Sequence, residues 1–143
     1  MNNQRAVIQA LLDYYAAFNS LDPQATLPFF HEPTLLIGPQ GVLAAPTHDI
    51  LTPVLATAIE SLRARRFGRS ELNVRRAEPL SASTTLVTGV AVRYKVDGQE
   101  LERAGATYVL QSAGNRWRIA VLIVHEPNEV ERAEVVSTDP RGT

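Results

Sequence analysis

Six consecutive apolar residues end in a histidine within the stretch RWRIAVLIVHEP at residues 116–127. Imidazole ionises near neutral pH, so His125 is the first side chain to consider as a general base or a ligand contact. Side chains alternate across a strand, and the uncharged face of this run consists of Trp117, Ile119, Val121, Ile123 and His125. We therefore expect His125 to face the interior at the open end of an apolar wall. The competing interpretation is a histidine that is hydrogen-bonded at a strand end.

The remaining histidines offer weaker chemistry. His31 follows LPFF at the expected end of a helix, where the helix C-terminus favours an imidazolium, and His48 precedes Asp49 in a loop expected at the surface. Asp49 is the one carboxylate that we consider as a base, against a capping or surface role. The three histidines show no metal-ligand spacing and cysteine is absent, so no metal site and no cofactor are predicted.

Two helices are expected in the N-terminal part of the chain. Residues 4–19 place apolar side chains at spacings of three and four, which is a broad helical stripe. The next segment contains Asp22, a good N-cap, and Pro23, which suits the first helical position. A second helix should therefore run from Pro23 to about His31.

A third helix is expected before Gly68, but its start is ambiguous. Thr47 and Thr52 are both good N-caps. We favour Thr52, because Pro53 would then lie in the first turn, where its missing N–H costs nothing. The alternative is a single kinked helix that starts at Thr47.

The second half of the chain has the period of strands. Residues 34–46 should form two short strands around the turn GPQG, and four longer strand-like runs follow at 70–80, 84–96, 100–112 and 116–126. Because short turns join these four runs, we expect a long antiparallel meander. In the run 84–96, alternation places Tyr94 on the inward face together with Leu86, Thr88, Val90, Val92 and Val96. Which face of the strand that carries Tyr108 points inward is left undecided, because the small residues on the opposite face would also suit a dimer contact.

Three helices followed by a long curved antiparallel sheet resemble the nuclear transport factor 2-like superfamily, and in particular its SnoaL-like members. The resemblance spans about residues 4–127 and is carried by LLDYYAAFNSLDPQATLPFFHEP, by the hairpin RYKVDGQEL and by GATYVLQSAGNRWRIAVLIVHEP. It implies an α+β fold, a cystatin-like cone in which the curved sheet wraps the helices around a deep apolar pocket. We expect one domain at 1–127, a loosely held tail at 128–143, and a homodimer through the outer face of the sheet, as in many members.

The resemblance also bears on chemistry. In the superfamily's ketosteroid isomerases a tyrosine of the first helix donates a hydrogen bond to a developing oxyanion, and Tyr14 is the nearest match here. Those isomerases also need a carboxylate base after the second helix and a protonated aspartate on the sheet. The stretch TLLIG and the expected inward positions of TGVAVRY contain no acid, and the aspartate, arginine, aspartate grouping of the epoxide hydrolases is absent. Ligand binding therefore ranks above catalysis.

Three functions follow as alternatives. The first is binding of a small apolar molecule in an aromatic pocket, in which the candidate ligand-binding residues are Phe18, Phe30, His31, Tyr94, Tyr108 and Trp117. The second is a lyase or isomerase that uses His125 as base and Tyr14 as oxyanion donor. The third is a dimerisation domain without a ligand, which predicts a filled interior.

Composition excludes several classes. The chain has 143 residues, 45% of them hydrophobic, and a formal net charge of -1, so one domain without a general affinity for nucleic acid or membrane is expected. The arginines between 63 and 76 lack the interleaved aromatics of a nucleic-acid surface. Cysteine is absent, so no disulfide forms, and no apolar run has the about 20 residues of a membrane span. A soluble cytoplasmic protein is expected.

Overall fold

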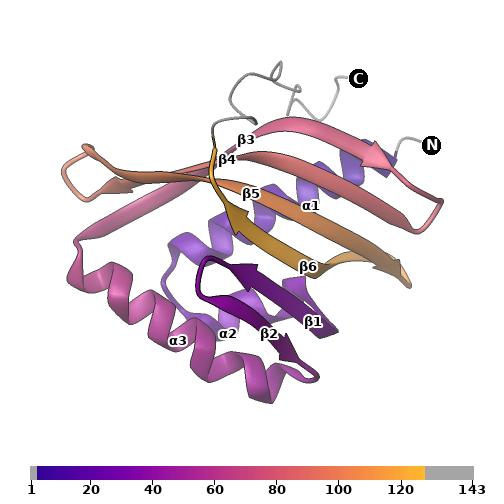
Figure 1. Cartoon of the computed structure of the whole chain (residues 1–143), viewed down its shortest axis with the longest axis horizontal. Coiled ribbons are helices and arrows are strands. Elements are labelled where there is room, and N and C mark those ends of the chain that lie inside the picture. The colour runs from indigo at the N-terminus through magenta and orange to yellow at the C-terminus, as the bar shows by residue number, and fades with distance from the viewer. Residues whose placement is uncertain (1–2, 128–143) are drawn as a thin grey trace.

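The computed structural model describes residues 3–127, which form an α+β structure (Figure 1). The helices are α1 at Asn3–Asn19, α2 at Pro23–Thr26 and α3 at His48–Ala64, with a 3-10 turn η1 at Leu27–Phe29. The strands are β1 at Phe30–Gly38, β2 at Gly41–Ala45, β3 at Phe67–Pro79, β4 at Thr84–Lys95, β5 at Glu100–Ala113 and β6 at Arg116–His125. Within this part of the chain every helix is too short or too polar to span a bilayer. The predicted tail at 128–143 lies outside the described residues.

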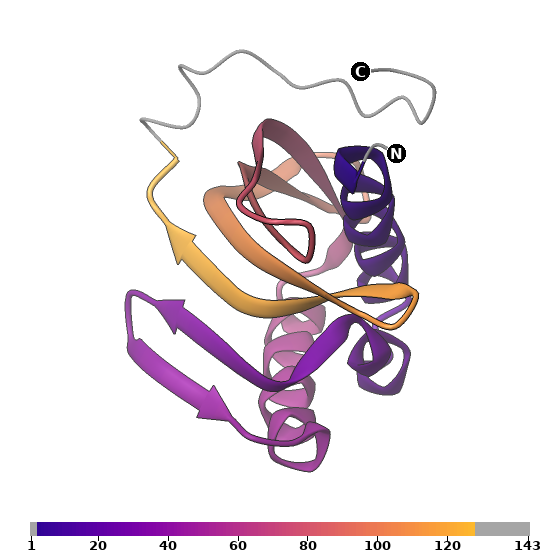
Figure 2. The ribbon, with the colours of Figure 1, turned by 90° about the vertical axis from the view of Figure 1, so that its right-hand side faces the viewer.

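The strands form one sheet in the order β2-β1-β6-β5-β4-β3. β3 to β6 are the antiparallel meander that the turn spacing predicts. β1 pairs with β6 in parallel, which makes the sheet mixed and joins the first hairpin to the meander. Figure 2 shows the sheet bending around helices that all lie on its concave side. This is the cone that the sequence resemblance implies.

Two predicted helix boundaries are wrong. The second helix does not reach His31, because Pro28 lacks the N–H that would continue an α-helix, and the chain passes through η1 into β1 at Phe30. Helix α3 starts from Thr47, whose hydroxyl accepts a hydrogen bond from the Ile50 N–H. Thr52 lies inside α3, where its hydroxyl donates to the carbonyl of His48 at 2.7 Å. The alternative of a single helix that starts at Thr47, with Pro53 inside it, is therefore confirmed as to its start.

The core lies between α1, α3 and the concave face of the sheet. Tyr14 is at the centre of an aromatic cluster, with ring centroids 5.6 Å from Tyr15 and 5.4 Å from Phe30 in edge-to-face geometry. Phe18 extends the cluster to Phe67, at 6.1 Å between centroids. Such pairs add about 1 kcal/mol each beyond the burial of their area. Helix α1 is thereby fixed against the strands that carry the site.

The concave face of β4 is not the one that alternation predicts. Val87 and Ala91 pack against the core and oppose Tyr108 and Ala104 of β5, whereas Val90 and Val92 lie on the convex face. β4 carries apolar residues on both faces, so hydrophobicity does not distinguish them.

The side chains of β6 also exchange faces partway along the strand. Val109 pairs with Val121 but the next residue of β5 pairs with Ile119, so Ala120 is an extra residue in β6. Such a bulge reverses the faces beyond it. Ile119 and Trp117 therefore pack against the core as predicted, while the residues from Val121 to His125 have the opposite alternation.

One buried hydroxyl in β4 gives a stability prediction. Thr85 is fully buried and, among residues 3–127, its hydroxyl has no hydrogen-bond partner. An unpaired buried hydroxyl costs about 1–3 kcal/mol, so Thr85→Val should raise the free energy of unfolding by about 1 kcal/mol. Urea denaturation measures this. The matched control is Thr34→Val, because the Thr34 hydroxyl donates to Ile119 at 3.0 Å and its loss should destabilise. Equal destabilisation by both substitutions would contradict the prediction.

Candidate functional site

A cavity of about 280 Å³ lies between α1 and the concave face of β3 to β6. Its lining residues are Tyr14, Tyr15, Phe18, Ser70, Ala91, Arg93, Glu102, Arg103, Ala104, Gly105, Ala106, Tyr108, Leu122 and Val124. Three of the predicted site residues are among them: Tyr14, Phe18 and Tyr108. Val124, one of the lining residues, is 40% exposed. The interior of the cone is therefore not completely filled by its own side chains.

Two tyrosines from different elements, both in the cavity lining, are hydrogen-bonded to each other. The hydroxyls of Tyr15, on α1, and Tyr108, on β5, are 2.5 Å apart. Each hydroxyl carries one proton, and one proton suffices for this hydrogen bond. The second proton is free to be donated. Among the described residues no other hydrogen bond of either hydroxyl occurs, nor any of the Tyr14 hydroxyl, so these donors are available to a molecule in the cavity.

Burial keeps these phenols neutral. It raises the pKa of Tyr15 to about 12, although the hydrogen bond with Tyr108 and the charge of Arg93 act in the opposite direction. Burial also raises the pKa of Tyr14 and of Tyr108 well above the ordinary value, again opposed by Arg93. At physiological pH all three side chains are therefore hydrogen-bond donors inside a poorly solvated space.

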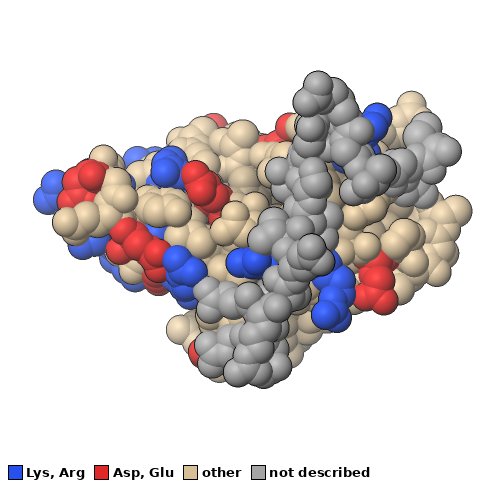
Figure 3. Space-filling model, turned by 90° about the horizontal axis from the view of Figure 1, so that it is seen from above, with Lys and Arg blue, Asp and Glu red and all other residues tan. Residues whose placement is uncertain are grey.

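An ionic network lies beside the tyrosines. Arg93 donates from Nη1 to Oε2 of Glu102 at 2.6 Å, and Arg65, at the end of α3, donates to Oε1 of the same carboxylate at 2.8 Å. Although burial alone would raise the pKa of Glu102, the hydrogen bonds from both arginines hold it below its usual value. Figure 3 shows acidic and basic side chains adjacent at the end of the molecule that carries the β4–β5 turn. Glu102 is thus an ion-paired carboxylate whose pKa is lowered by its two arginine partners.

The end of α1 is fastened to β3 beside the cavity. The side chain of Asn19 accepts hydrogen bonds from the Ser70 backbone N–H at 2.8 Å and from its hydroxyl at 2.9 Å. It also donates to the Ser70 carbonyl at 3.1 Å. These three bonds fix the helix relative to the sheet, and with it the position of Tyr15 relative to Tyr108.

His125 is on the convex face, contrary to the predicted alternation. It is opposite Gly105, and its Nε2 is 2.7 Å from the hydroxyl of Thr107. Its Nδ1 donates to the carbonyl of Glu126 at 2.9 Å. A Cβ on Gly105 would come within 2.4 Å of the His125 ring, so the glycine leaves the space in which the ring lies. The geometry is that of a histidine hydrogen-bonded at a strand end, outside the cavity.

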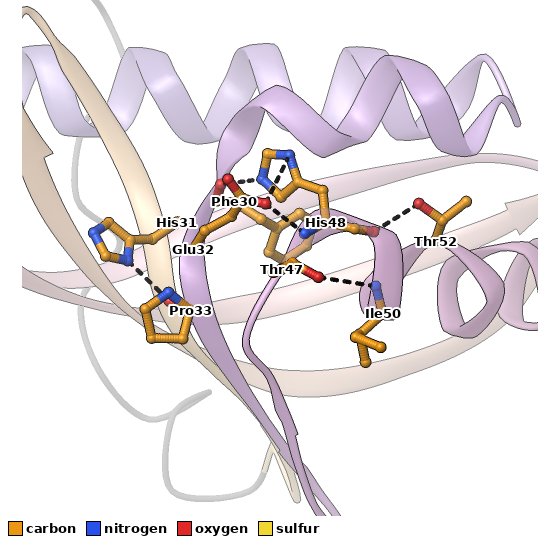
Figure 4. Close-up of polar contacts among 8 residues, drawn as sticks. All are labelled: Phe30, His31, Glu32, Pro33, Thr47, His48, Ile50 and Thr52. Atoms are coloured by element: carbon orange, nitrogen blue, oxygen red, sulfur yellow. Dashed lines mark hydrogen bonds and ion pairs between the residues drawn. The ribbon is translucent and has the colours of Figure 1, made fainter.

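The other predicted residues also lie outside the cavity lining. Phe30 and Trp117 pack in the core, and Tyr94 lies on the convex face with the guanidinium of Arg69 4.3 Å from its ring centroid. His31 donates to the carbonyl of Pro33, and His48 donates from Nε2 to the carbonyl of Phe30 at 2.8 Å (Figure 4). The backbone N–H of His48 donates to Oε2 of Glu32 at 2.6 Å, and its Nδ1 lies 3.8 Å from the same oxygen.

These two histidines therefore bind the backbone at the start of β1. Asp49 is exposed in the first turn of α3. Within residues 3–127 no group of three or more His, Asp or Glu is arranged to hold a metal ion.

The sequence defines the class to which this fold and cavity belong. Residues 4–127 match the family described as NTF2-like protein (DUF6841), and the chain belongs to that family. None of the curated protein sequences compared with it matches.

Among solved structures the chain is similar to an NTF2-like protein of unknown function from Shewanella oneidensis. The two share 16% identity over 87% of this chain and 100% of the other, with a TM-score of 0.71. It is also similar to a ketosteroid isomerase-like protein from Erwinia carotovora, with 22% identity, 87% and 97% coverage and a TM-score of 0.64. A putative calcium/calmodulin-dependent protein kinase type II association domain from Thiobacillus denitrificans shares 14% identity over 82% and 91%, with a TM-score of 0.67. At these identities the similarity establishes the fold and leaves the function open.

Proposed function

We propose that the cavity binds a small, mainly apolar molecule whose oxygen atom accepts a hydrogen bond from the tyrosine pair. The observation that carries the proposal is the Tyr15–Tyr108 contact, with two buried hydroxyls on the cavity wall and one proton free to be donated. Small-molecule sites typically combine an apolar enclosure with a few converging polar groups. Aromatic and aliphatic side chains from α1, β4, β5 and β6 supply that enclosure.

Binding fits the site better than catalysis does. Proton abstraction requires a base whose pKa lies near the working pH. The carboxylate in the cavity lining, Glu102, is ion-paired with two arginines that lower its pKa and make it a weaker base, and His125 lies on the other face of the sheet. The ketosteroid isomerase-like relative shares the fold, and a phenol pair suits a ketone oxygen, but the described residues offer no matching base. Homodimerisation through the convex face stays a prediction.

Tyrosine substitutions test this proposal. With 2-acetonaphthone as a neutral aromatic ketone, we expect saturable binding by calorimetry and a rise in melting temperature that depends on ketone concentration. Tyr108→Phe alone would leave the Tyr15 hydroxyl with a proton to donate. The double variant Tyr15→Phe/Tyr108→Phe keeps both rings and removes both hydroxyls, so its affinity for the ketone should fall by about 3- to 10-fold. Its affinity for 2-ethylnaphthalene, which lacks the oxygen, should not change.

The control variant is His125→Ala, which should bind the ketone as the wild type does, because His125 lies outside the cavity. Two results would refute the proposal. One is the absence of saturable binding by either compound, and the other is an equal loss of affinity for both compounds in Tyr15→Phe/Tyr108→Phe.

A further inference from the structure

Charge is not balanced at the cavity wall. Glu102 is shared by two guanidinium groups, and each binds a different oxygen of the one carboxylate. The third arginine in the vicinity, Arg103, is paired separately, with Glu100 at 2.6 Å. The group Arg65–Glu102–Arg93 therefore carries a net charge of one positive unit, and two of its members, Arg93 and Glu102, line the cavity.

Arg93 has unused hydrogen-bond donors. A guanidinium has five N–H groups, and among residues 3–127 a single hydrogen bond of Arg93 occurs, from Nη1 to Glu102. Arginine binds a carboxylate most strongly through two parallel hydrogen bonds. Within these residues Arg93 makes only one, to Oε2 of Glu102, and Arg65 binds Oε1 of the same carboxylate. Arg93 is thus a cation with an incomplete set of acceptors. Its position over the ring of Phe18, at 5.9 Å, directs it along the cavity wall.

Arg93 and the three buried tyrosines line the same cavity. The charge of Arg93 favours the ionised form of Tyr14, Tyr15 and Tyr108, although burial has the larger and opposite effect. Arg93 therefore contributes a positive potential at the hydroxyl pair. An oxygen atom that carries negative charge would be stabilised there by two kinds of donor in a poorly solvated environment.

We propose that the molecule bound in the cavity is a monocarboxylate with an aromatic or alicyclic body, and that its carboxylate pairs with Arg93 and accepts a hydrogen bond from the Tyr15–Tyr108 pair. This inference rests on the proposed function and adds the charge of the ligand. The apolar body lies against the rings of α1 and the small residues Ala91 and Ala106. Arg65 has a supporting role, because it holds Glu102 from the side away from the cavity lining.

A pair of isosteric probes separates charge from shape. Binding of 2-naphthoate and of its amide, 2-naphthamide, is measured by calorimetry at physiological ionic strength. We expect the wild type to bind the carboxylate about 10-fold or more tightly than the amide, because charge-assisted hydrogen bonds are roughly twice as strong as neutral ones. In Arg93→Gln this preference should disappear, while the affinity for the amide should change by less than about threefold.

The matched control is Arg65→Gln. It also removes one positive partner of Glu102, but Arg65 is not a lining residue of the cavity. This variant should lower the preference for 2-naphthoate without abolishing it, because the net positive charge of the group is lost while Arg93 and its free donors remain. Equal loss in the two variants would overturn the proposed contact with Arg93, since it would show a general charge effect. Equal affinity of the wild type for carboxylate and amide, with 2-acetonaphthone still bound, would overturn the inference and leave the proposed function standing. Failure of the acid, the amide and the ketone to bind would overturn both.

Discussion

Alkaline solution is expected to unfold this protein through its buried tyrosines. Burial raises the pKa of Tyr15 from 10.0 to about 12, and those of Tyr14 and Tyr108 shift in the same direction. Between these values the unfolded chain releases phenolic protons that the folded chain retains, so stability falls as the pH rises. The contribution is fully present below pH 10 and is lost as the pH passes through about 12. Two pKa units on Tyr15 alone correspond to about 3 kcal/mol.

Few other side chains change their charge in this pH range. Thirteen of the fourteen basic residues are arginines, which stay protonated in this range, and Lys95 is the one lysine. Urea denaturation from neutral pH to about pH 12 should show the loss of stability, and tyrosinate absorbance of the buried phenols should appear together with unfolding.

Tyr14→Phe is the cleanest variant, because within residues 3–127 the Tyr14 hydroxyl makes no hydrogen bond that the substitution would break. It should flatten the pH dependence without destabilising the protein at neutral pH. Ionisation of all tyrosines near pH 10 in a protein that stays folded would contradict the prediction.

Most of the fold could be predicted from local patterns. The helical stripe at 4–19 and the four strand-like runs correspond to α1 and β3 to β6, because short turns and strict periodicity act along neighbouring residues. The parallel pairing of β1 with β6 joins segments about 85 residues apart, as the bond from Thr34 to Ile119 illustrates, and no turn specifies it. The bulge at Ala120 is likewise invisible to alternation, and it alone turns His125 outward.

The site was predicted in part of its aromatic lining and was missed in its charged part. Tyr14, Phe18 and Tyr108 line the cavity as predicted, but the other predicted aromatic residues lie outside the lining, and Tyr15 was not among the predicted site residues. Arg93 and Glu102 look like solvent-facing charges. The signal that could have found them is the hairpin register: around the Asp97–Gly98 turn, positions 93 and 102 face each other, and opposite charges there form a cross-strand pair.

Substitution of Phe30 and of Phe18 should change the free energy of unfolding by different amounts, because Phe30 lies in the core and Phe18 borders the cavity. Phe30 is fully buried, packs edge-to-face on Tyr14, and pairs through its backbone with Ile119. Phe30→Ala should lower the free energy of unfolding by about 3–5 kcal/mol. Phe18→Ala should cost less, since part of its ring already borders the cavity and makes fewer contacts there. Urea midpoints at constant m-value measure both changes.

The two variants should also differ in ligand binding. Where folded, Phe18→Ala should weaken binding of 2-acetonaphthone, because it removes a wall of the cavity, whereas the folded fraction of Phe30→Ala should bind with wild-type affinity. Equal losses of stability in the two variants, or weaker binding in Phe30→Ala alone, would show that the boundary between core and cavity runs elsewhere. The predicted difference follows from one physical distinction. A core aromatic residue has partner atoms on all sides, and a site residue leaves one side of its ring for the ligand.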